Sequence, residues 1–198
     1  MVRPYSDACE RNREPILEAL RQHFADRRRV LEIGSGTGQH AVHFAAALPH
    51  LLWQTSELEP NLAGIRLWVE ESSLPNLPPP IALDVTGTWP DIQFDGVFTA
   101  NTLHIMSWPD VRSLFAALPK VLAADAVLAV YGPFNYNGRF TSPSNASFDE
   151  WLKQRSPHSG IRDFAAVDEL ARSIGFTLIE DRPMPANNRT LVWRRSAA

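Results

Sequence analysis

The sequence predicts a doubly wound α/β fold, in which a mostly parallel sheet carries helices on both faces. Residues 30–48 run from a short apolar strand, through Gly34, Gly36 and Gly38, into apolar residues at helical spacing. A strand, a glycine-rich turn and a helix in this order form the ligand-binding corner of such folds. Strand-like and helix-like segments then alternate along the chain and end in an antiparallel pair of strands, as in α/β proteins.

The bulk composition narrows the function. With 198 residues, 44% of them hydrophobic and 21% charged, the chain is predicted to form one domain, 1–198. A net charge of -3 disfavours a nucleic-acid partner, and the basic run at 27–29 is interpreted as a solvated helix end. The single cysteine, Cys9, and the lack of a signal segment or long apolar run predict a cytoplasmic protein without a membrane partner. No Cys and His cluster has metal-ligand spacing, so no metal is predicted.

The N-terminal segment is predicted to be a cover. Residues 5–24 begin with a polar stretch and become an amphipathic helix, for which Pro15 suits the first turn. Because this helix precedes the first strand, we expect residues 1–28 to lie over the sheet. Arg11 and Asn12 stand at the helix entrance, where they either close over a ligand or form ordinary polar surface.

The glycine spacing indicates the ligand. A dinucleotide-binding turn needs a glycine where this chain has Gln39, and no Gly-Lys-Ser/Thr phosphate loop is present. Glu32 lies two residues before the first glycine. A carboxylate there would repel a pyrophosphate, whereas it suits a cationic ligand.

Acidic residues also end the next two strands. The second predicted strand ends in Glu57, which could accept hydrogen bonds from two ribose hydroxyls, with Glu59 as the competing candidate. The third ends in Asp84 and Val85, whose carboxylate and N–H suit the amino group and a ring nitrogen of adenine. Ligands of such sheets bind outside the carboxyl ends of the strands, so these residues are predicted to share one edge with Glu32.

The fourth strand, 94–100, delivers Asn101 and His104 to the same edge. The ligand crevice lies where the strand order reverses, which places both residues near the reacting atom. His104 is a candidate general base near neutral pH, or a histidine that only packs in the crevice.

The second half of the chain continues the alternation. A long polar, turn-rich insertion, 132–162, is predicted to cover a substrate or to form a structural flap. The remaining segments are predicted as helices at 61–71, 111–118 and 164–174, and strands at 127–131, 176–181 and 190–194.

These features resemble the class I S-adenosylmethionine (AdoMet) methyltransferases, over essentially the whole chain. That resemblance implies a seven-stranded sheet of order 3-2-1-4-5-7-6 with strand seven antiparallel. A narrower resemblance is to the family of methyltransferase-like protein 26, long described as a domain of unknown function. The motifs that carry it are Glu10-Arg11-Asn12, Pro15-Ile16-Leu17, Gly36-Thr37-Gly38-Gln39-His40, Trp53-Gln54-x-Ser56, Asn101-x-x-His104-Ile105, Tyr131-Gly132-Pro133-Phe134, Gly160-Ile161-Arg162-Asp163 and Met184-Pro185-Ala186-Asn187-Asn188.

The resemblance implies AdoMet as cofactor and S-adenosylhomocysteine as product. Strand two of the family often ends in aspartate, whereas this chain has Glu57, which can still bind a ribose diol. The cofactor-binding residues that it implies are Glu32, Gly34, Ser35, Gly36, Gly38, Glu57, Leu58, Asp84, Val85, Asn101, Arg11 and Asn12.

The predicted reaction is methyl transfer to a small-molecule acceptor by in-line displacement, with His104 needed only if the nucleophile arrives protonated. No Asn-Pro-Pro-Tyr run follows strand four, which disfavours DNA and glutamine acceptors. Two alternatives stay open, a non-catalytic AdoMet-binding adaptor and a nicotinamide-dependent oxidoreductase, and the oligomeric state is not predicted. The candidate substrate contacts, each with a packing alternative, are Tyr131, Tyr136, Trp108, Trp151 and Asn188.

Overall fold

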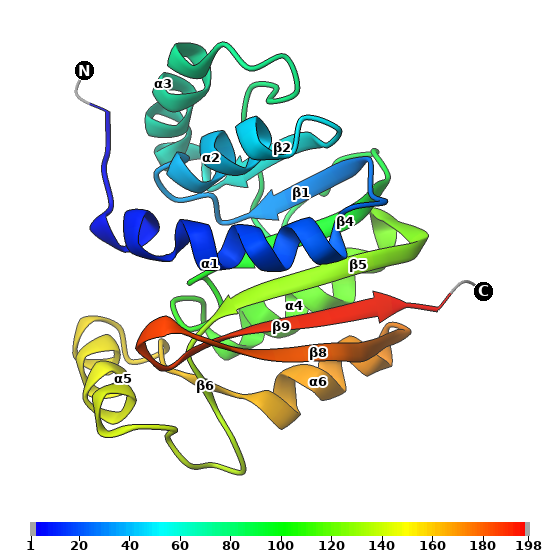
Figure 1. Cartoon of the computed structure of the whole chain (residues 1–198). Coiled ribbons are helices and arrows are strands. Elements are labelled where there is room, and N and C mark those ends of the chain that lie inside the picture. The colour runs from blue at the N-terminus through cyan, green and yellow to red at the C-terminus, as the bar shows by residue number, and fades with distance from the viewer. Residues whose placement is uncertain (1–2, 197–198) are drawn as a thin grey trace.

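In the computed structural model, residues 3–196 are described and contain a seven-stranded sheet of order β3-β2-β1-β4-β5-β9-β8 (Figure 1). Strand β9 runs antiparallel to both of its neighbours, and the other pairs are parallel. The predicted doubly wound fold and strand order are therefore confirmed. The strands are β1 Arg29–Ile33, β2 Leu52–Glu57, β3 Ile81–Ala82, β4 Phe94–Ala100, β5 Leu122–Gly132, β8 Phe176–Met184 and β9 Asn188–Arg195.

Helices cover both faces of the sheet. One apolar cluster joins α1, α2 and α3 to one face, and a second joins α4 and α6 to the other (Figure 1). None of the helices within residues 3–196 is both long and apolar enough to cross a membrane. The helices are α1 Asp7–His23, α2 Gln39–Ala47, α3 Leu62–Ser72, α4 Trp108–Ala117, α5 Pro143–Arg155 and α6 Phe164–Ser173, with the 3₁₀ turns η1 Glu59–Asn61, η2 Leu118–Lys120 and η3 Pro185–Asn187.

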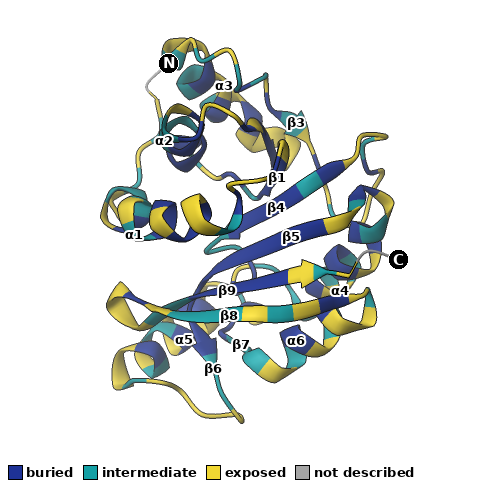
Figure 2. Ribbon diagram, turned by 45° about the vertical axis from the view of Figure 1, so that its right-hand side comes forward, coloured by how far each residue is buried: buried dark blue, intermediate teal, exposed yellow. Residues whose placement is uncertain are grey.

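Strand β5 shows how the sequence builds the two-sided core. Successive side chains of a strand point to opposite faces. Leu128 and Val130 therefore join the cluster under α4 and α6, whereas Ala129 and Tyr131 join the cluster under α1. The central strands are buried along most of their length, as the dark blue ribbon of Figure 2 shows. Polar side chains of these strands consequently reach the surface where the strands end.

The first helix begins earlier than the sequence suggested. Ser6 has extended backbone angles and precedes α1, which starts at Asp7 and carries Pro15 in its interior, so the placement of Pro15 in the first turn was wrong. Asp7 and Glu10 lie in the first turn, where negative charge suits the positive end of the helix dipole. Buried residues flank Pro15 on both sides along α1, among them Asn12 and Ile16, and this packing compensates for the hydrogen bond that a proline cannot donate.

The insertion 132–162 contains a helix that the sequence analysis missed. Helix α5 starts at Pro143, directly after Ser142, whose hydroxyl accepts a hydrogen bond from Asn145 N at 3.1 Å. Two of its buried residues, Asn145 and Asp149, are polar, so the chain shows little helical hydrophobic periodicity there. The insertion also forms β6 Phe134–Asn135, which pairs in parallel with β7 Arg162–Asp163.

Candidate functional site

The glycine turn between β1 and α2 is held against its neighbours on one side and is open on the other. Gly34 N and Ser35 N both donate to Ser56 O, at 3.1 and 3.0 Å. A Cβ at Gly34, whose φ is +70°, would lie 2.7 Å from the Thr102 side chain. At Gly36, with φ +56°, a Cβ would meet no atom within 4 Å. Gly36 is therefore the position where a ligand can approach the main chain.

Glu57 lies beside that open position. Its Oε2 accepts from Gly36 N at 3.0 Å and its Oε1 from Leu58 N at 2.9 Å. Leu58, which is half exposed, extends the same edge, whereas Glu59 already belongs to the η1 turn. The geometry therefore favours Glu57 over Glu59 as a group that faces a ligand on Gly36.

Glu32 supports the glycine turn from below. It is 2% exposed, and its Oε2 accepts from Ser35 Oγ and from Trp53 Nε1, both at 3.0 Å. Burial raises the pKa of Glu32 to about 7, although these two hydrogen bonds oppose the shift. The Glu32 carboxyl group thus takes up or releases a proton near neutral pH while it holds the turn.

Asp84 follows β3 at the same edge. Its Oδ1 accepts from Thr86 N at 2.9 Å and from Thr86 Oγ1 at 2.7 Å, and these hydrogen bonds lower the pKa of Asp84. Leu83 N donates to Glu57 O at 2.9 Å, so Asp84 and Val85 follow a residue that is joined to the end of β2. The three predicted acids therefore end three neighbouring strands.

Asn101 and His104 lie together in the loop after β4. Asn101 has a left-handed backbone, φ 57°, and its N–H donates to Tyr131 O at 2.9 Å. A Cβ at Gly132 would lie 3.7 Å from His104 Nδ1 and 3.9 Å from Asn101 Oδ1. Because Thr102 of this loop contacts Gly34, the loop also borders the glycine turn. The structure thus unites the predicted polar residues of the first and fourth strands.

His104 is more enclosed than a typical base at neutral pH. It is 5% exposed, and its ring meets the Phe148 ring edge-on at 5.4 Å. Burial lowers the pKa of His104 to about 4, and the charge of Arg162 acts in the same direction. That pKa is well below the near-neutral value expected from the sequence, so the imidazole is uncharged at pH 7.

Arg162 fixes this loop, although no role was predicted for it from the sequence. Its guanidinium donates to Leu103 O at 3.0 Å, to Met106 O and to His158 O at 3.0 Å. Gly160 N donates to His104 O at 2.9 Å. The only signal for these contacts was the quoted Gly160-Ile161-Arg162-Asp163 motif.

Of the candidate substrate contacts, Tyr131 and Asn188 lie on neighbouring strands, because Tyr131 pairs with Thr190 and Asn188 lies two residues from Thr190. Burial raises the pKa of Tyr131, and hydrogen bonds from Asn12 and Asn188 oppose this effect together with the charge of Arg11. Helix α1, which carries Arg11 and Asn12, packs against both β5 and β9, the strands of these two candidates.

The other three candidates are engaged with protein groups. Tyr136 donates to Asp181 Oδ2 at 2.7 Å and stacks on Phe164. Trp108 faces the Arg162 guanidinium, 5.9 Å from its ring centroid. Trp151 stacks on Phe148 at 5.7 Å, and Arg155 lies over its ring at 4.7 Å, so protein groups pack against the Trp151 ring as well.

The N-terminal segment is attached across the start of α2. Gln39 Oε1 accepts from Ser6 N at 2.5 Å, and Gln39 Nε2 donates to Glu10 Oε1 at 3.1 Å. The neighbouring His40 Nε2 lies 2.7 Å from Asn12 Oδ1. Gln39, which in the sequence stood out only as a departure from the dinucleotide pattern, thus binds the N-terminal segment to the glycine turn.

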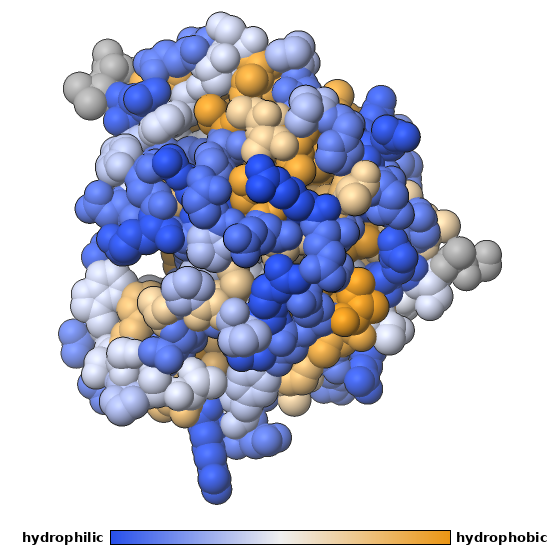
Figure 3. All heavy atoms as spheres, in the orientation of Figure 1, coloured by the Kyte–Doolittle hydropathy of each residue, from blue (hydrophilic) through white to orange (hydrophobic). Residues whose placement is uncertain are grey.

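The surface is hollowed between the N-terminal helix and the helix of the insertion. Figure 3 shows a hollow at the left, between the surfaces over α1 and α5 in the orientation of Figure 1. No group of three or more His, Cys, Asp or Glu among residues 3–196 could hold a metal ion.

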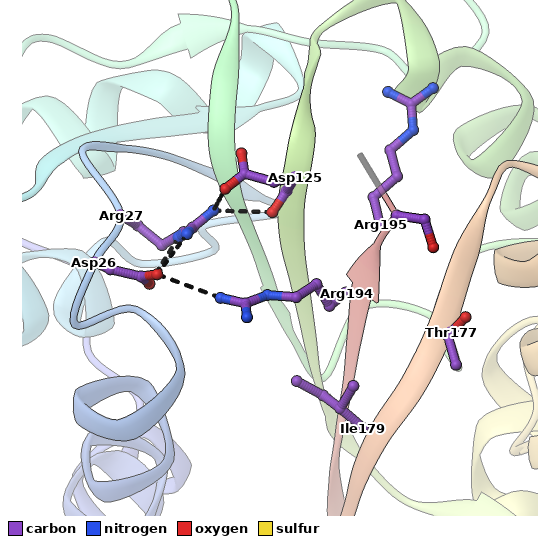
Figure 4. Close-up of a pocket in the computed structure, with 8 residues that line it drawn as sticks. Asp26, Arg27, Asp125, Thr177, Ile179, Arg194 and Arg195 are labelled. Carbon is purple, nitrogen blue, oxygen red and sulfur yellow. Dashed lines mark hydrogen bonds and ion pairs between the residues drawn. The ribbon is translucent and has the colours of Figure 1, made fainter. Parts of the chain in front are cut away.

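A separate depression of about 540 Å³ lies at the opposite edge of the sheet (Figure 4). Arg27 is 4% exposed there and pairs with Asp26 at 2.7 Å and Asp125 at 3.1 Å, while Arg194 also reaches Asp26. These charges compensate one another, which favours a structural ion network. The interpretation of the basic run as a solvated helix end was therefore wrong for Arg27, since α1 ends at His23 and Arg27 is buried.

Comparison with known proteins places this geometry in context. A model of a family described as a protein of unknown function, DUF938, matches residues 3–195. An O-methyltransferase family protein from Burkholderia thailandensis has a TM-score of 0.82 at 17% identity, covering 97% of this chain and 58% of that one. The S-adenosylmethionine-dependent methyltransferase SibL gives 0.80 at 23% identity, covering 96% and 56%.

Human N-acetylserotonin methyltransferase in complex with SAM gives a TM-score of 0.79 at 14% identity, covering 96% of this chain and 53% of that one. This chain thus spans a little over half the length of these three structures. At such identities the matches show a common fold, that of class I methyltransferases.

Proposed function

This chain belongs to the DUF938 family, described as proteins of unknown function, and we propose that it is an AdoMet-dependent methyltransferase with a small-molecule acceptor. The observation that carries the proposal is the open main chain at Gly36 with the Glu57 carboxylate hydrogen-bonded to its N–H. The shared fold and the narrower resemblance to the methyltransferase-like protein 26 family support it.

The residues at the edge fit this cofactor. Glu57 is assigned to the ribose hydroxyls, and Asp84 with Val85 to the adenine. Glu32 and the Asn101 carbonyl are assigned to the methionine end, with Gly34, Ser35 and Gly38 shaping the turn. AdoMet supplies an electrophilic methyl group on a sulfonium, which an aligned nucleophile displaces in line.

The protein's own task is alignment and exclusion of water. Holding two reactants in a productive geometry lowers a barrier by roughly 7–11 kcal/mol in favourable cases. We assign residues 1–28 and 132–162 to closing the site from two sides within a single domain, 1–198. His104, uncharged at neutral pH, is the candidate proton acceptor beside Asn101.

The surroundings suit a small acceptor. The net charge of -3 does not favour a nucleic-acid partner. The single cysteine supports assignment to a reducing compartment, the cytoplasm. The acceptor itself is not specified by these features.

Calorimetric titration with AdoMet, S-adenosylhomocysteine and a nicotinamide dinucleotide tests the proposal. We expect micromolar binding of the first two ligands only. Glu57→Ala should weaken binding at least tenfold, whereas the matched Glu59→Ala should leave it unchanged. Failure of both adenosyl ligands to bind, or equal binding of the dinucleotide, would contradict the proposal. Binding without methyl transfer to any acceptor of a broad panel would instead favour the adaptor function.

A further inference from the structure

Polar side chains from three elements converge beside the end of β5. We call this group the Tyr131 cluster, defined as Arg11 and Asn12 of α1, Tyr131 of β5, and Asn188 and Thr190 of β9. Tyr131 pairs with Thr190 in the antiparallel ladder, so their side chains share one face of the sheet. Asn188 lies two residues from Thr190 and therefore on that same face.

Asn12 has a defined orientation. It is 7% exposed, and its Oδ1 lies 2.7 Å from His40 Nε2. An amide oxygen can only accept a hydrogen bond, so His40 donates and the Asn12 amide oxygen is occupied. The Asn12 NH2 group is thereby left to donate to another group, and α1 packs against β5, the strand that carries Tyr131.

Thr190 is the most deeply buried member of the cluster, and its hydrogen bonding is incomplete. It is 0% exposed, and within residues 3–196 its Oγ1 has no hydrogen-bond partner. Leaving a hydroxyl buried without a partner costs about 1–3 kcal/mol. The polar surroundings of Tyr131 therefore exceed what packing alone requires.

The cluster also carries an uncompensated charge. Glu10 is paired with Arg13 at 2.6 Å and Glu14 with His43 at 3.3 Å. None of the ion pairs formed by the described residues includes Arg11, and no member of the cluster is acidic. A guanidinium beside amide and hydroxyl donors favours an anionic ligand.

We infer that the Tyr131 cluster binds a carboxylate group of the methyl acceptor. Gly132 connects the cluster to the site, because it follows Tyr131 and a Cβ at its position would lie within 4 Å of both His104 and Asn101. When Arg11 and Tyr131 hold its carboxylate, the rest of the acceptor extends toward His104 and Asn101. The identification of the ligand as the methyl acceptor rests on the proposed function. The binding of an anion rests on the residues of the cluster alone.

The test compares benzoate with its neutral isostere benzamide by ligand-observed NMR titration, with and without S-adenosylhomocysteine. We expect benzoate to bind at least tenfold more tightly. Arg11→Gln should remove most of that preference, and Tyr131→Phe should weaken benzoate binding a few-fold. Arg21→Gln is the matched control at the other end of α1 and should keep the preference.

The inference is overturned if neither probe binds, if benzamide binds as well as benzoate, or if Arg11→Gln keeps the preference. The calorimetric titration with AdoMet and S-adenosylhomocysteine distinguishes failure of the carboxylate site from failure of the proposed function. Carboxylate preference without adenosyl-ligand binding contradicts the methyltransferase assignment only. The reverse result contradicts the carboxylate site only.

Discussion

The Trp53 indole donates a hydrogen bond to Glu32 Oε2 at 3.0 Å, beneath the turn that carries the proposed cofactor site. Ser35 Oγ donates to the same oxygen at 3.0 Å. One carboxyl group therefore joins the second strand to the glycine turn, and its protonation affects both. Stability and cofactor binding are consequently expected to depend on the same titration.

Stability should fall as the pH rises through the range of this group. The pKa of Glu32 is raised from 4.5 to about 7 in the native protein. Between these values the unfolded chain loses a proton that the native protein keeps, so the free energy of unfolding decreases with rising pH and then levels off. The full effect is on the order of 3 kcal/mol. Urea unfolding of the unaltered protein, of Glu32→Gln and of the control Glu59→Gln at pH 5 to 8 measures it. Equal pH profiles for all three proteins would refute the raised pKa.

Two alanine substitutions in the glycine turn should separate stability from binding. Gly34→Ala introduces a Cβ 2.7 Å from Thr102 in a left-handed conformation, so we expect a loss of 2 kcal/mol or more, roughly the sum of strain and overlap. Gly36→Ala should cost only about 1–2 kcal/mol but abolish AdoMet binding. Thermal unfolding measures the loss of stability, and calorimetric titration measures the loss of AdoMet binding.

A double variant checks the reason for the Gly34 effect. Thr102→Ala should recover part of the stability lost in Gly34→Ala, because it removes the overlapping atoms. Additive losses in the double-mutant cycle would show that the overlap is not the cause.

His104 should titrate far below neutral pH. The pKa of His104 is near 4 in the native protein, whereas in the unfolded chain it has its ordinary value of 6.5. Between these two values the unfolded chain binds a proton that the native protein does not, so the free energy of unfolding decreases as the pH falls from 6.5 toward 4. NMR titration of the histidine ring protons measures the value directly. His104→Ala should spare AdoMet binding and lower turnover, and undiminished turnover would remove the proton-acceptor role.

Arg162 should be irreplaceable by lysine. Its guanidinium donates to three carbonyl groups at once, those of Leu103, Met106 and His158. An ammonium group cannot reproduce that planar arrangement of donors. We expect Arg162→Lys to cost about 1–3 kcal/mol and to speed amide hydrogen exchange at 101–107. Arg172→Lys is the matched control, since Arg172 is exposed and a lysine can keep its ion pair with Asp168, and it should change neither quantity measurably. Unaltered exchange in Arg162→Lys would argue against a positioning role.

The features that could be predicted from the sequence are those that depend on short segments of it. Alternating apolar residues and glycines 34 to 38 gave the sheet and the turn, because those patterns are local. The helix α5 was hidden because Asn145 and Asp149 occupy buried positions where apolar residues are expected. The low pKa of His104 depends on burial beside Phe148 in the distant insertion, which no local pattern reports.

The positions of the candidate residues, though not their roles, were predictable to a similar extent. The acids at the strand ends followed from the rule that parallel strands share a ligand-binding edge. The choice of Glu57 over Glu59 needed the hydrogen bond from Gly36. The Tyr131 cluster needed the register of β5 against β9, which fixes Thr190 opposite Tyr131 and cannot be read from either strand alone.

The position of β9 also has a consequence during synthesis on the ribosome. This strand enters the sheet between β5 and β8, although both of them precede it in the chain. Until residues 188–195 emerge, the outer edge of β5 has no strand to pair with, and unpaired edges invite aggregation. Asn188 and Thr190 arrive in the same segment, so the Tyr131 cluster is completed last, in the step that also covers the exposed edge of β5.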